Sequence, residues 1–343
     1  MMYLVLKVMI KKCVAILRSL GGRKKKLLIL PLLLYLLILV TTCWWLVQLV
    51  TKALLPPPPP DQNLEHFRRN RSLAHYMDHI SLLIEPSSVP CSDLDVVPLL
   101  ILVTSAPSRF HHRQTVRSTW GSYQPTYFIL GLDAHDSEGM LGENYMEAKE
   151  YRDVVVYDFL DHYQNLTLKT ALMIQWTIDR CPQAKFLLKT DDDVLVNPWA
   201  MEEVLKENGD AQLLGYKLTA YLHRDEYAKW YIPRWIYPED VVPDYLSGSG
   251  YLIAGEYLTS IMATSYQIPL VNLEDIYFTY LVAKALRLSL THDSRLNPYR
   301  PWLSTGCSYW SLALSHSFKP DEMAATWDKI KYISNFNDRH YCT

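Results

Sequence analysis

The sequence lacks an excess of basic residues. Its 34 Lys and Arg against 36 Asp and Glu give a formal net charge of −2, whereas a protein that binds a nucleic-acid duplex usually presents a basic face. The composition therefore gives no support to nucleic-acid binding. No internal repeat is evident, so nothing indicates a repeat array. Cysteine is scarce as well, with six in 343 residues.

The run from Leu27 to Val50 contains no charged side chain. As a helix rising about 1.5 Å per residue, this run exceeds the roughly 30 Å hydrocarbon thickness of a bilayer. Eight Lys and Arg precede it and only Lys52 follows closely, so the positive-inside rule puts the N-terminus in the cytosol. A cleaved signal peptide is the alternative, but its hydrophobic region is shorter and no convincing cleavage site follows. We predict an uncleaved signal-anchor.

The remaining chain divides into a spacer and one globular domain. Pro56 to Pro60 form an unbroken proline run, which favours stiff, extended polyproline II. We predict a cytosolic basic tail at residues 1–26, a transmembrane signal-anchor at 27–50, a luminal Pro-rich stem at 51–90 and a folded domain at 91–343. The folded domain is long enough to bury a substantial single core.

Four cysteines and two sequons would face the lumen. Four cysteines in an oxidising compartment allow three disulfide pairings, which the sequence does not rank. Two Asn-x-Ser/Thr sequons, at Asn70 and Asn165, are compatible with glycosylation. The four cysteines are Cys91, Cys181, Cys307 and Cys342.

Short apolar runs follow one another from residue 97 onward. Runs of this kind are typical of strands buried on both faces of a largely parallel sheet. Thr167–Asp179 between them has helical spacing of its apolar residues, and strands alternating with helices predict an α/β layered domain. The predicted strands are Leu99–Ser105, Tyr127–Gly131, Val154–Tyr157 and Phe186–Lys189.

Three carboxylates directly follow the last predicted strand, at Asp191, Asp192 and Asp193. Crowding three like charges is unfavourable unless a cation neutralises them, and hard oxygen ligands suit Mg²⁺ or Mn²⁺ together with a diphosphate. An acidic turn that caps the next helix is the alternative. An EF-hand fits poorly, because Val196 stands where its loop needs glycine. Ligands of α/β sheets gather at the carboxyl ends of strands, which favours the metal.

Seven separate motifs follow one another along the chain. They are Arg113–Gly121 (RQTVRSTWG), Asn165–Thr170 (NLTLKT), Lys189–Asn197 (KTDDDVLVN), Lys229–Tyr231 (KWY), Pro243–Tyr251 (PDYLSGSGY), Leu273–Tyr277 (LEDIY) and His316–Met323 (HSFKPDEM). In this order and spacing they resemble the inverting β-1,3-galactosyltransferase and β-1,3-N-acetylglucosaminyltransferase family, and most closely its galactosyltransferase branch. The resemblance covers roughly Leu99 to Cys342. It implies a GT-A fold with a Rossmann-like sheet, a single-pass type II Golgi membrane protein with a luminal catalytic domain, and Mn²⁺ as cofactor, with Mg²⁺ as the alternative.

The resemblance also implies roles for individual residues. Asp191 and Asp193 match the DxD pair, with Asp193 as the direct metal ligand, Asp191 nearer the nucleotide sugar, and His316 as a further metal ligand. Arg113 and Arg117, four residues apart on one helix face, together with Asp191 and Asp192 would bind the donor. A solvated helix face is the alternative reading of the two arginines.

The LEDIY motif implies the general base. Asp275 would remove the proton of the acceptor hydroxyl, and the start of a helix capped by Asn272 and running through Leu286 would keep its carboxylate ionised. The residues expected to bind the acceptor are Glu274, Trp230, Tyr231, Tyr245 and Gly248. The chain departs from the family at Thr279, where glycine is common.

The predicted activity is metal-dependent transfer of galactose from UDP-galactose, in β-1,3 linkage, to a terminal N-acetylhexosamine of a glycoprotein or glycolipid. A β-1,3-N-acetylglucosaminyltransferase that acts on galactose-terminated glycans is the first alternative. A catalytically silent luminal carbohydrate-binding membrane protein is the second. The sequence leaves the oligomeric state open.

Overall fold

The computed structural model describes residues 22–54, 64–87, 91, 96–226, 228–335 and 342. The chain divides into two compact units, Met1–Pro60 and Asp61–Thr343. Most of the predicted cytosolic tail and the proline run of the predicted stem lie outside the described residues.

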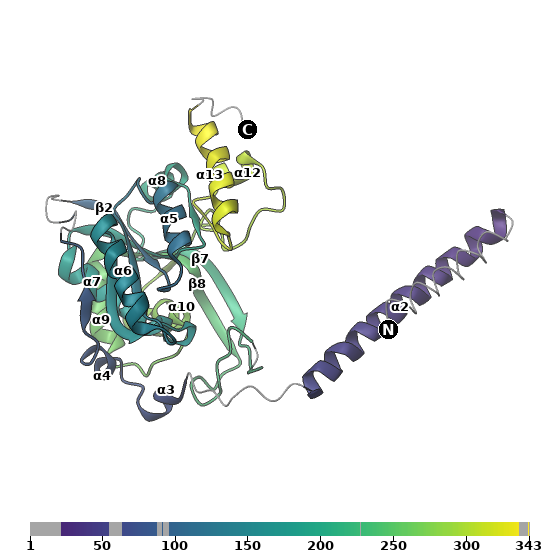
Figure 1. Ribbon diagram of the computed structural model, residues 1–343, viewed down its shortest axis with the longest axis horizontal. Helices are drawn as coiled ribbons and strands as arrows, with labels where there is room; N and C mark the ends of the chain where they lie inside the picture. Colours follow the sequence, from purple (N-terminus) through teal and green to yellow (C-terminus); the bar gives the residue numbers. More distant parts are fainter. Residues whose placement is uncertain are drawn as a thin grey trace. The chain divides into compact units, whose positions relative to one another are not determined.

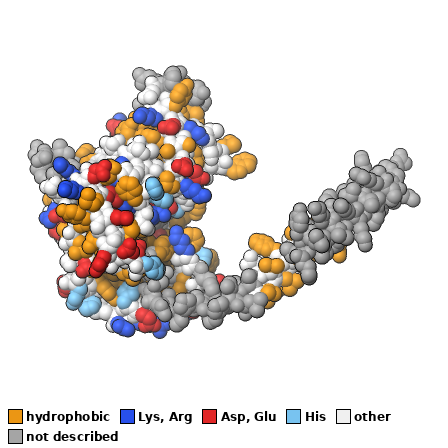
Figure 2. All heavy atoms as spheres, viewed as in Figure 1, with side chains coloured by type: hydrophobic (Ala, Val, Ile, Leu, Met, Phe, Trp, Pro, Cys, Tyr) orange, Lys and Arg blue, Asp and Glu red, His pale blue; other side chains and the backbone are white. Residues whose placement is uncertain are grey.

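The first unit contains one long helix, α2 (Gly22–Leu54), which includes the run predicted as a signal-anchor. Large hydrophobic side chains are exposed along its described part (Figure 2). Within the part of the chain that the structure describes, no helix combines the length and apolar character that crossing a membrane would require. The signal-anchor remains a prediction.

The second unit is built on an eight-stranded mixed sheet (Figure 1). All four strands predicted from the sequence are present, and they pair in parallel, which confirms the α/β class. Strand β8 then joins β5 in the antiparallel direction. The sheet order is β1 (Leu82–Ile84), β4 (Val154–Leu160), β3 (Thr126–Leu132), β2 (Val97–Thr104), β5 (Ala184–Asp191), β8 (Val241–Ala254), β7 (Leu213–Tyr221) and β9 (Leu290–His292).

The order of the parallel strands reverses between β2 and β5. From β2 the chain adds β3 and then β4 on one side, and it returns to place β5 on the other. In doubly wound sheets the crevice at such a switch point, outside the carboxyl ends of the strands, is where ligands bind. Thr104 at the end of β2 stands in register with Asp191 at the end of β5, so the acidic triad begins at the switch point.

Helices cover both faces of the sheet (Figure 1). Along β2, Leu99, Ile101 and Val103 belong to one buried core, whereas Leu100 and Leu102 belong to the other. This two-sided burial is what the unbroken apolar runs predicted. Helices α7 (Leu166–Arg180) and α9 (Leu258–Ser265) contribute to one core, and α5 (Phe110–Ser118), α6 (Ser137–Tyr151), α8 (Pro198–Glu207) and α13 (Pro320–Asn335) contribute to the other.

Smaller elements complete the second unit. A two-stranded sheet pairs β6 (Leu195–Val196) with β10 (Leu314–Ser315) in the antiparallel direction. The remaining short helices are α3 (Glu65–Arg69), α4 (Leu73–Met77), α12 (Gly306–Trp310) and the 3₁₀ turns Tyr163–Asn165 and Gly255–Tyr257.

The helical run predicted through Leu286 is present but is not a uniform α-helix. It begins as α10 (Glu274–Ile276), continues as a π-helical turn (Tyr277–Val282) and ends as α11 (Ala283–Leu286). The prediction that Asn272 caps this helix is wrong, because Leu273 occupies the capping position without a side-chain bond. The Asn272 amide instead donates to the Tyr231 carbonyl at 3.1 Å.

The structure gives the disulfide pairing and the surroundings of one of the two sequons. The disulfides join Cys91 to Cys181 and Cys307 to Cys342, a pairing that the sequence left open. Asn165 is buried, with 8% of its surface exposed, and its side-chain amide donates to the Leu160 carbonyl. The Asn165 side chain therefore lies inside the folded domain, and the use of this sequon stays a prediction.

Candidate active site

The acidic triad turns away from β5 at the switch point, and β2 supplies its first partners. The Thr104 hydroxyl donates to the Asp191 carboxylate, and the Ser105 hydroxyl donates to Asp192 Oδ2 at 2.6 Å. Arg109, just beyond β2, donates to both carboxylate oxygens of Asp192 at 2.6–2.9 Å. Asp192 is therefore buried and satisfied within the protein, and its carboxylate holds the turn.

A segment far along the chain reaches the third aspartate of the triad. The pairing of β10 with β6 sets Ser315 opposite Leu195, and the Phe318 amide donates to the Asp193 carbonyl at 2.9 Å. These contacts put His316 Nε2 at 3.4 Å from Asp193 Oδ1.

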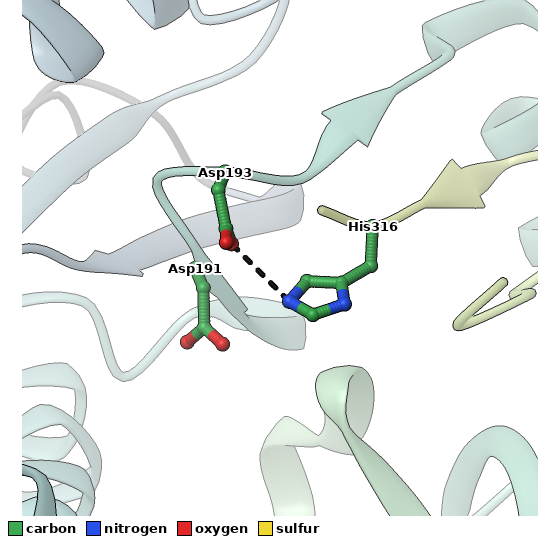
Figure 3. A group of neighbouring side chains, drawn as sticks. All are labelled: Asp191, Asp193 and His316. Atoms are coloured by element: carbon green, nitrogen blue, oxygen red, sulfur yellow. Dashed lines mark ion pairs between the residues drawn. The ribbon is translucent and has the colours of Figure 1, made fainter. Parts of the chain in front are cut away.

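Asp191, Asp193 and His316 form one cluster of potential metal ligands. One ligand atom from each lies within 4.8 Å of the others (Figure 3). Two carboxylates and an imidazole suit a cation such as Mn²⁺. Burial raises the pKa of Asp193, but the hydrogen bond from His316, with Arg109 and Lys229 nearby, outweighs burial and lowers it overall. The Asp193 carboxylate is thus ionised at neutral pH.

Lys189 connects the acidic triad to the segment that carries the predicted base. Its side chain is buried, and its ammonium group donates to Asp191 Oδ1 at 2.8 Å, to Glu274 Oε1 at 2.9 Å and to the Gly248 carbonyl at 2.7 Å. Burial lowers the pKa of Lys189, but the two carboxylates outweigh burial and raise it. All three of its N–H donors are used, so a charged lysine joins β5, β8 and α10.

Asp275 presents a carboxylate held by two backbone amides. Ile276 N donates to its Oδ1 at 2.8 Å and Gly248 N donates to its Oδ2 at 3.2 Å. A side chain at position 248 would lie 3.0 Å from that Oδ2 and 2.9 Å from Glu274 Oε1. Gly248 therefore serves the site by lacking a side chain.

The prediction that the helix start keeps Asp275 ionised is wrong, because two opposing effects on its pKa are larger. Burial and the charge of Glu274 raise the pKa of Asp275 to about 7, against the lowering effect of the two amides and Lys189. The helical run behind Asp275 continues to Leu286, but its dipole does not offset burial and the charge of Glu274. A pKa near neutrality still suits a general base.

The two arginines predicted to bind the donor point into the protein. Arg113 is fully buried, and its guanidinium donates to both carboxylate oxygens of Glu147 and to Ser105 Oγ. Arg117 donates to Glu147 and to Asp153. They share one helix face, as predicted, but these contacts do not fit direct binding of a donor. Their role is to hold α5 and, through Ser105, the triad.

The residues predicted to bind the acceptor differ in exposure. Trp230 has 51% of its surface exposed and its ring lies 5.5 Å from that of His223. Tyr245 is buried beside the site, where burial and Asp275 raise its pKa, and Tyr231 is half-buried. Glu274 is buried and forms an ion pair with Lys189. Its carboxylate therefore faces this lysine and not the solvent side, where an acceptor would bind.

Similarity to known proteins agrees with this geometry. A family model described as Galactosyltransferase matches residues 111–294, more than half of the chain. Human beta-1,3-galactosyltransferase 1 is 32% identical over 243 residues, which cover 68% of this chain and 73% of that protein. The chain belongs to the galactosyltransferase family.

Human beta-1,3-galactosyltransferase 2 is 30% identical over 247 residues, covering 68% of this chain and 58% of that protein. A solved galactosyltransferase, LgtC with donor and acceptor sugar analogues, aligns with a TM-score of 0.34 and 13% identity over 68% of this chain and 94% of its own. That similarity is too low to bear on function. Membership of the galactosyltransferase family makes the protein a hexosyltransferase.

Sequence reasoning missed three residues in this galactosyltransferase site. Ser105 and Arg109 lie at or just after the end of a predicted strand, so the rule that ligands gather at carboxyl ends would have pointed to both. Lys189 stands inside the KTDDDVLVN motif, but a lysine in a buried strand carries no signal for its partners. Its contact with Glu274, 85 positions away, follows only from the tertiary fold.

Proposed function

We propose that the protein transfers galactose from UDP-galactose, with inversion, in β-1,3 linkage to a terminal N-acetylhexosamine of a glycoprotein or glycolipid. The proposal rests on one observation, that Lys189 links the candidate metal ligands to the segment that carries the candidate base. A cluster suited to a divalent cation and a carboxylate with a pKa near 7 flank one buried lysine, Lys189. Family membership and the named relatives support galactose as the transferred sugar.

The donor side uses the triad. Asp191, Asp193 and His316 would hold Mn²⁺, with Mg²⁺ as the alternative, because their oxygen and imidazole ligands fit such a cation. When bound, the cation neutralises negative charge on the departing UDP. Asp192 keeps the turn in place through Arg109 and Ser105, so the two outer aspartates remain directed toward the donor.

The acceptor side uses Asp275 as general base. Inversion requires the acceptor hydroxyl to attack from the face opposite UDP, and a carboxylate there accepts the hydroxyl proton as the new bond forms. Two backbone amides fix the direction of the Asp275 carboxylate. Trp230, half of whose surface is exposed, would contact the sugar rings of the acceptor, and Tyr245, buried beside Asp275, would shape the acceptor side of the site.

The same proposal covers the cellular setting. Residues 1–26 would be cytosolic, residues 27–50 in α2 would anchor the protein in the Golgi membrane, and residues 51–90 would space the catalytic domain, 91–343, from the bilayer. Two disulfides in the second unit agree with a luminal, oxidising location. The doubly wound sheet with its switch-point site supports the GT-A assignment.

One assay separates the candidate functions. The purified protein is incubated with a panel of UDP-sugars and defined acceptors, in Mn²⁺ or in EDTA. Galactose transfer that EDTA abolishes supports the proposal, whereas transfer of N-acetylglucosamine identifies the alternative enzyme. Binding of UDP and glycan without turnover would identify a silent carbohydrate-binding protein.

A further inference from the structure

Thr279 makes two hydrogen bonds between elements that carry the site. It is fully buried in the π-helical turn that follows Asp275. Its hydroxyl donates to the Asp275 carbonyl at 2.6 Å and accepts from the Leu246 amide at 2.8 Å. A hydroxyl has one donor and two acceptor positions, so both bonds form at once. The second bond ties the turn to strand β8.

Strand β8 is irregular at the point where Thr279 meets it. Gly215 of β7 pairs with Tyr251, but Lys217 pairs with Leu246, so residues 247–250 form an enlarged bulge in the β7–β8 ladder. Bulges redirect side chains and recur next to active sites. Gly248 lies in this bulge, and its amide donates to Asp275 Oδ2.

These contacts close a ring around the carboxylate. The ring runs from the Asp275 side chain to Gly248, back along β8 to Leu246, across to the Thr279 hydroxyl and on to the Asp275 carbonyl. The side chain and the backbone of Asp275 are therefore both held by one three-residue stretch of β8, from Leu246 to Gly248. A change at Thr279 would release one half of the ring and leave the other in place.

We propose that Thr279 is a positioning residue for transfer: its hydroxyl fixes the direction in which the Asp275 carboxylate meets the acceptor hydroxyl. Thr279 itself touches no substrate. The proposal rests on the assignment of Asp275 as base. A displacement of about 1 Å in a catalytic group lowers a rate by as much as a hundredfold, so loss of the Thr279 hydroxyl is expected to lower kcat about tenfold or more and to leave donor affinity unchanged.

The test compares four variants of the full-length protein. Thr279→Val keeps the shape and removes the hydroxyl, whereas Thr279→Ser keeps the hydroxyl. Thr177→Val is the matched control, because Thr177 is equally buried and its hydroxyl donates within α7 to the Met173 carbonyl. Asp275→Asn removes the base. Galactose transfer is measured over ranges of donor and acceptor concentration, together with UDP affinity in Mn²⁺.

The expected result is a kcat about tenfold or more lower in Thr279→Val, with donor KM and UDP affinity within about twofold of wild type. Thr279→Ser and Thr177→Val should both stay near the wild-type kcat. If Thr279→Val does not fold, Thr279→Ala against Thr279→Ser gives the same comparison of absent and present hydroxyl.

Two results would overturn the positioning role of Thr279 and leave the proposed function standing. One is a wild-type kcat in Thr279→Val while Asp275→Asn is inactive. The other is an equal loss in Thr279→Ser and Thr279→Val, which would assign the effect to packing. A wild-type rate in Asp275→Asn would instead overturn the base assignment and the positioning role with it.

Discussion

Replacing Lys189 with methionine removes a buried cation and leaves its partners behind. Methionine keeps the apolar stem, but Asp191 Oδ1, Glu274 Oε1 and the Gly248 carbonyl lose a donor at 2.7–2.9 Å. The Lys189 and Glu274 side chains are only 2% and 6% exposed, so solvent does not replace the lost contacts. Deleting one member of a buried ion pair costs about 3–5 kcal/mol.

This cost translates into a clear thermal shift. For a domain of about this size, each kcal/mol lowers Tm by about 2–4 °C, so Lys189→Met should unfold roughly 10 °C earlier than wild type. Differential scanning calorimetry in EDTA measures the shift without a cation at Asp191. The control is Arg68→Met, which breaks the exposed Arg68–Glu65 pair and should change stability by less than about 1 kcal/mol.

A double variant tests whether the loss of stability comes from an unpaired buried carboxylate. If the loss arises from an uncompensated buried carboxylate, Glu274→Leu added to Lys189→Met should restore part of the Tm, because the orphaned charge is then gone. A Tm for Lys189→Met no lower than that of Arg68→Met would refute the ion-pair account. The ion-pair account would also be refuted if the loss of Tm in the double variant equalled the sum of the losses in the two single variants.

Four further outcomes are expected. The kcat/KM of transfer should fall about tenfold per pH unit below about pH 7, since burial and Glu274 raise the pKa of Asp275 in the free protein to about 7 and only the ionised form accepts a proton; a flat profile of kcat/KM down to pH 5 would contradict this. Because the folded state then binds this proton more tightly than the unfolded state, the contribution of Asp275 to stability should decrease as pH rises from about 4 to 7, which pH-dependent denaturation measures. Asp193→Ala should abolish both transfer and the rise in Tm that Mn²⁺ produces in wild type, and a retained Mn²⁺ shift would remove Asp193 from the ligand set. Asn165→Gln should leave the glycosidase-sensitive mass of the secreted or membrane-bound protein unchanged, because Asn165 is buried, with Asn70→Gln as the comparison for the more accessible sequon.

The sequence by itself determined the layered domain and the place of the acidic triad. Leu99–Val103 and Phe186–Leu188 are apolar at every position, a pattern typical of a strand covered on both faces. A triad directly after such a strand must then lie at the ligand-binding edge of the sheet. These are local properties, and neighbouring residues along the chain are sufficient to specify them.

Tertiary structure alone decided which charges were free and which were already paired. Arg113 and Arg117 match a donor-binding motif, yet Glu147 from a different helix pairs with both, and Asp153 pairs with Arg117 as well. The helix start predicted an ionised Asp275, but burial and the adjacent Glu274 raise its pKa. Electrostatic energy depends on distance and desolvation in space, and neither can be read from residue spacing along the chain.

The same distinction explains Lys189 and Thr279. Gly248 and Glu274 lie 59 and 85 positions from Lys189, and Leu246 lies 33 positions from Thr279. No pattern of apolar residues predicts the bulge in β8 beside Leu246. Sequence periodicity reports which face of an element is buried. Which buried polar atoms meet one another is fixed only when the elements pack, because hydrogen bonds require contact within about 3 Å.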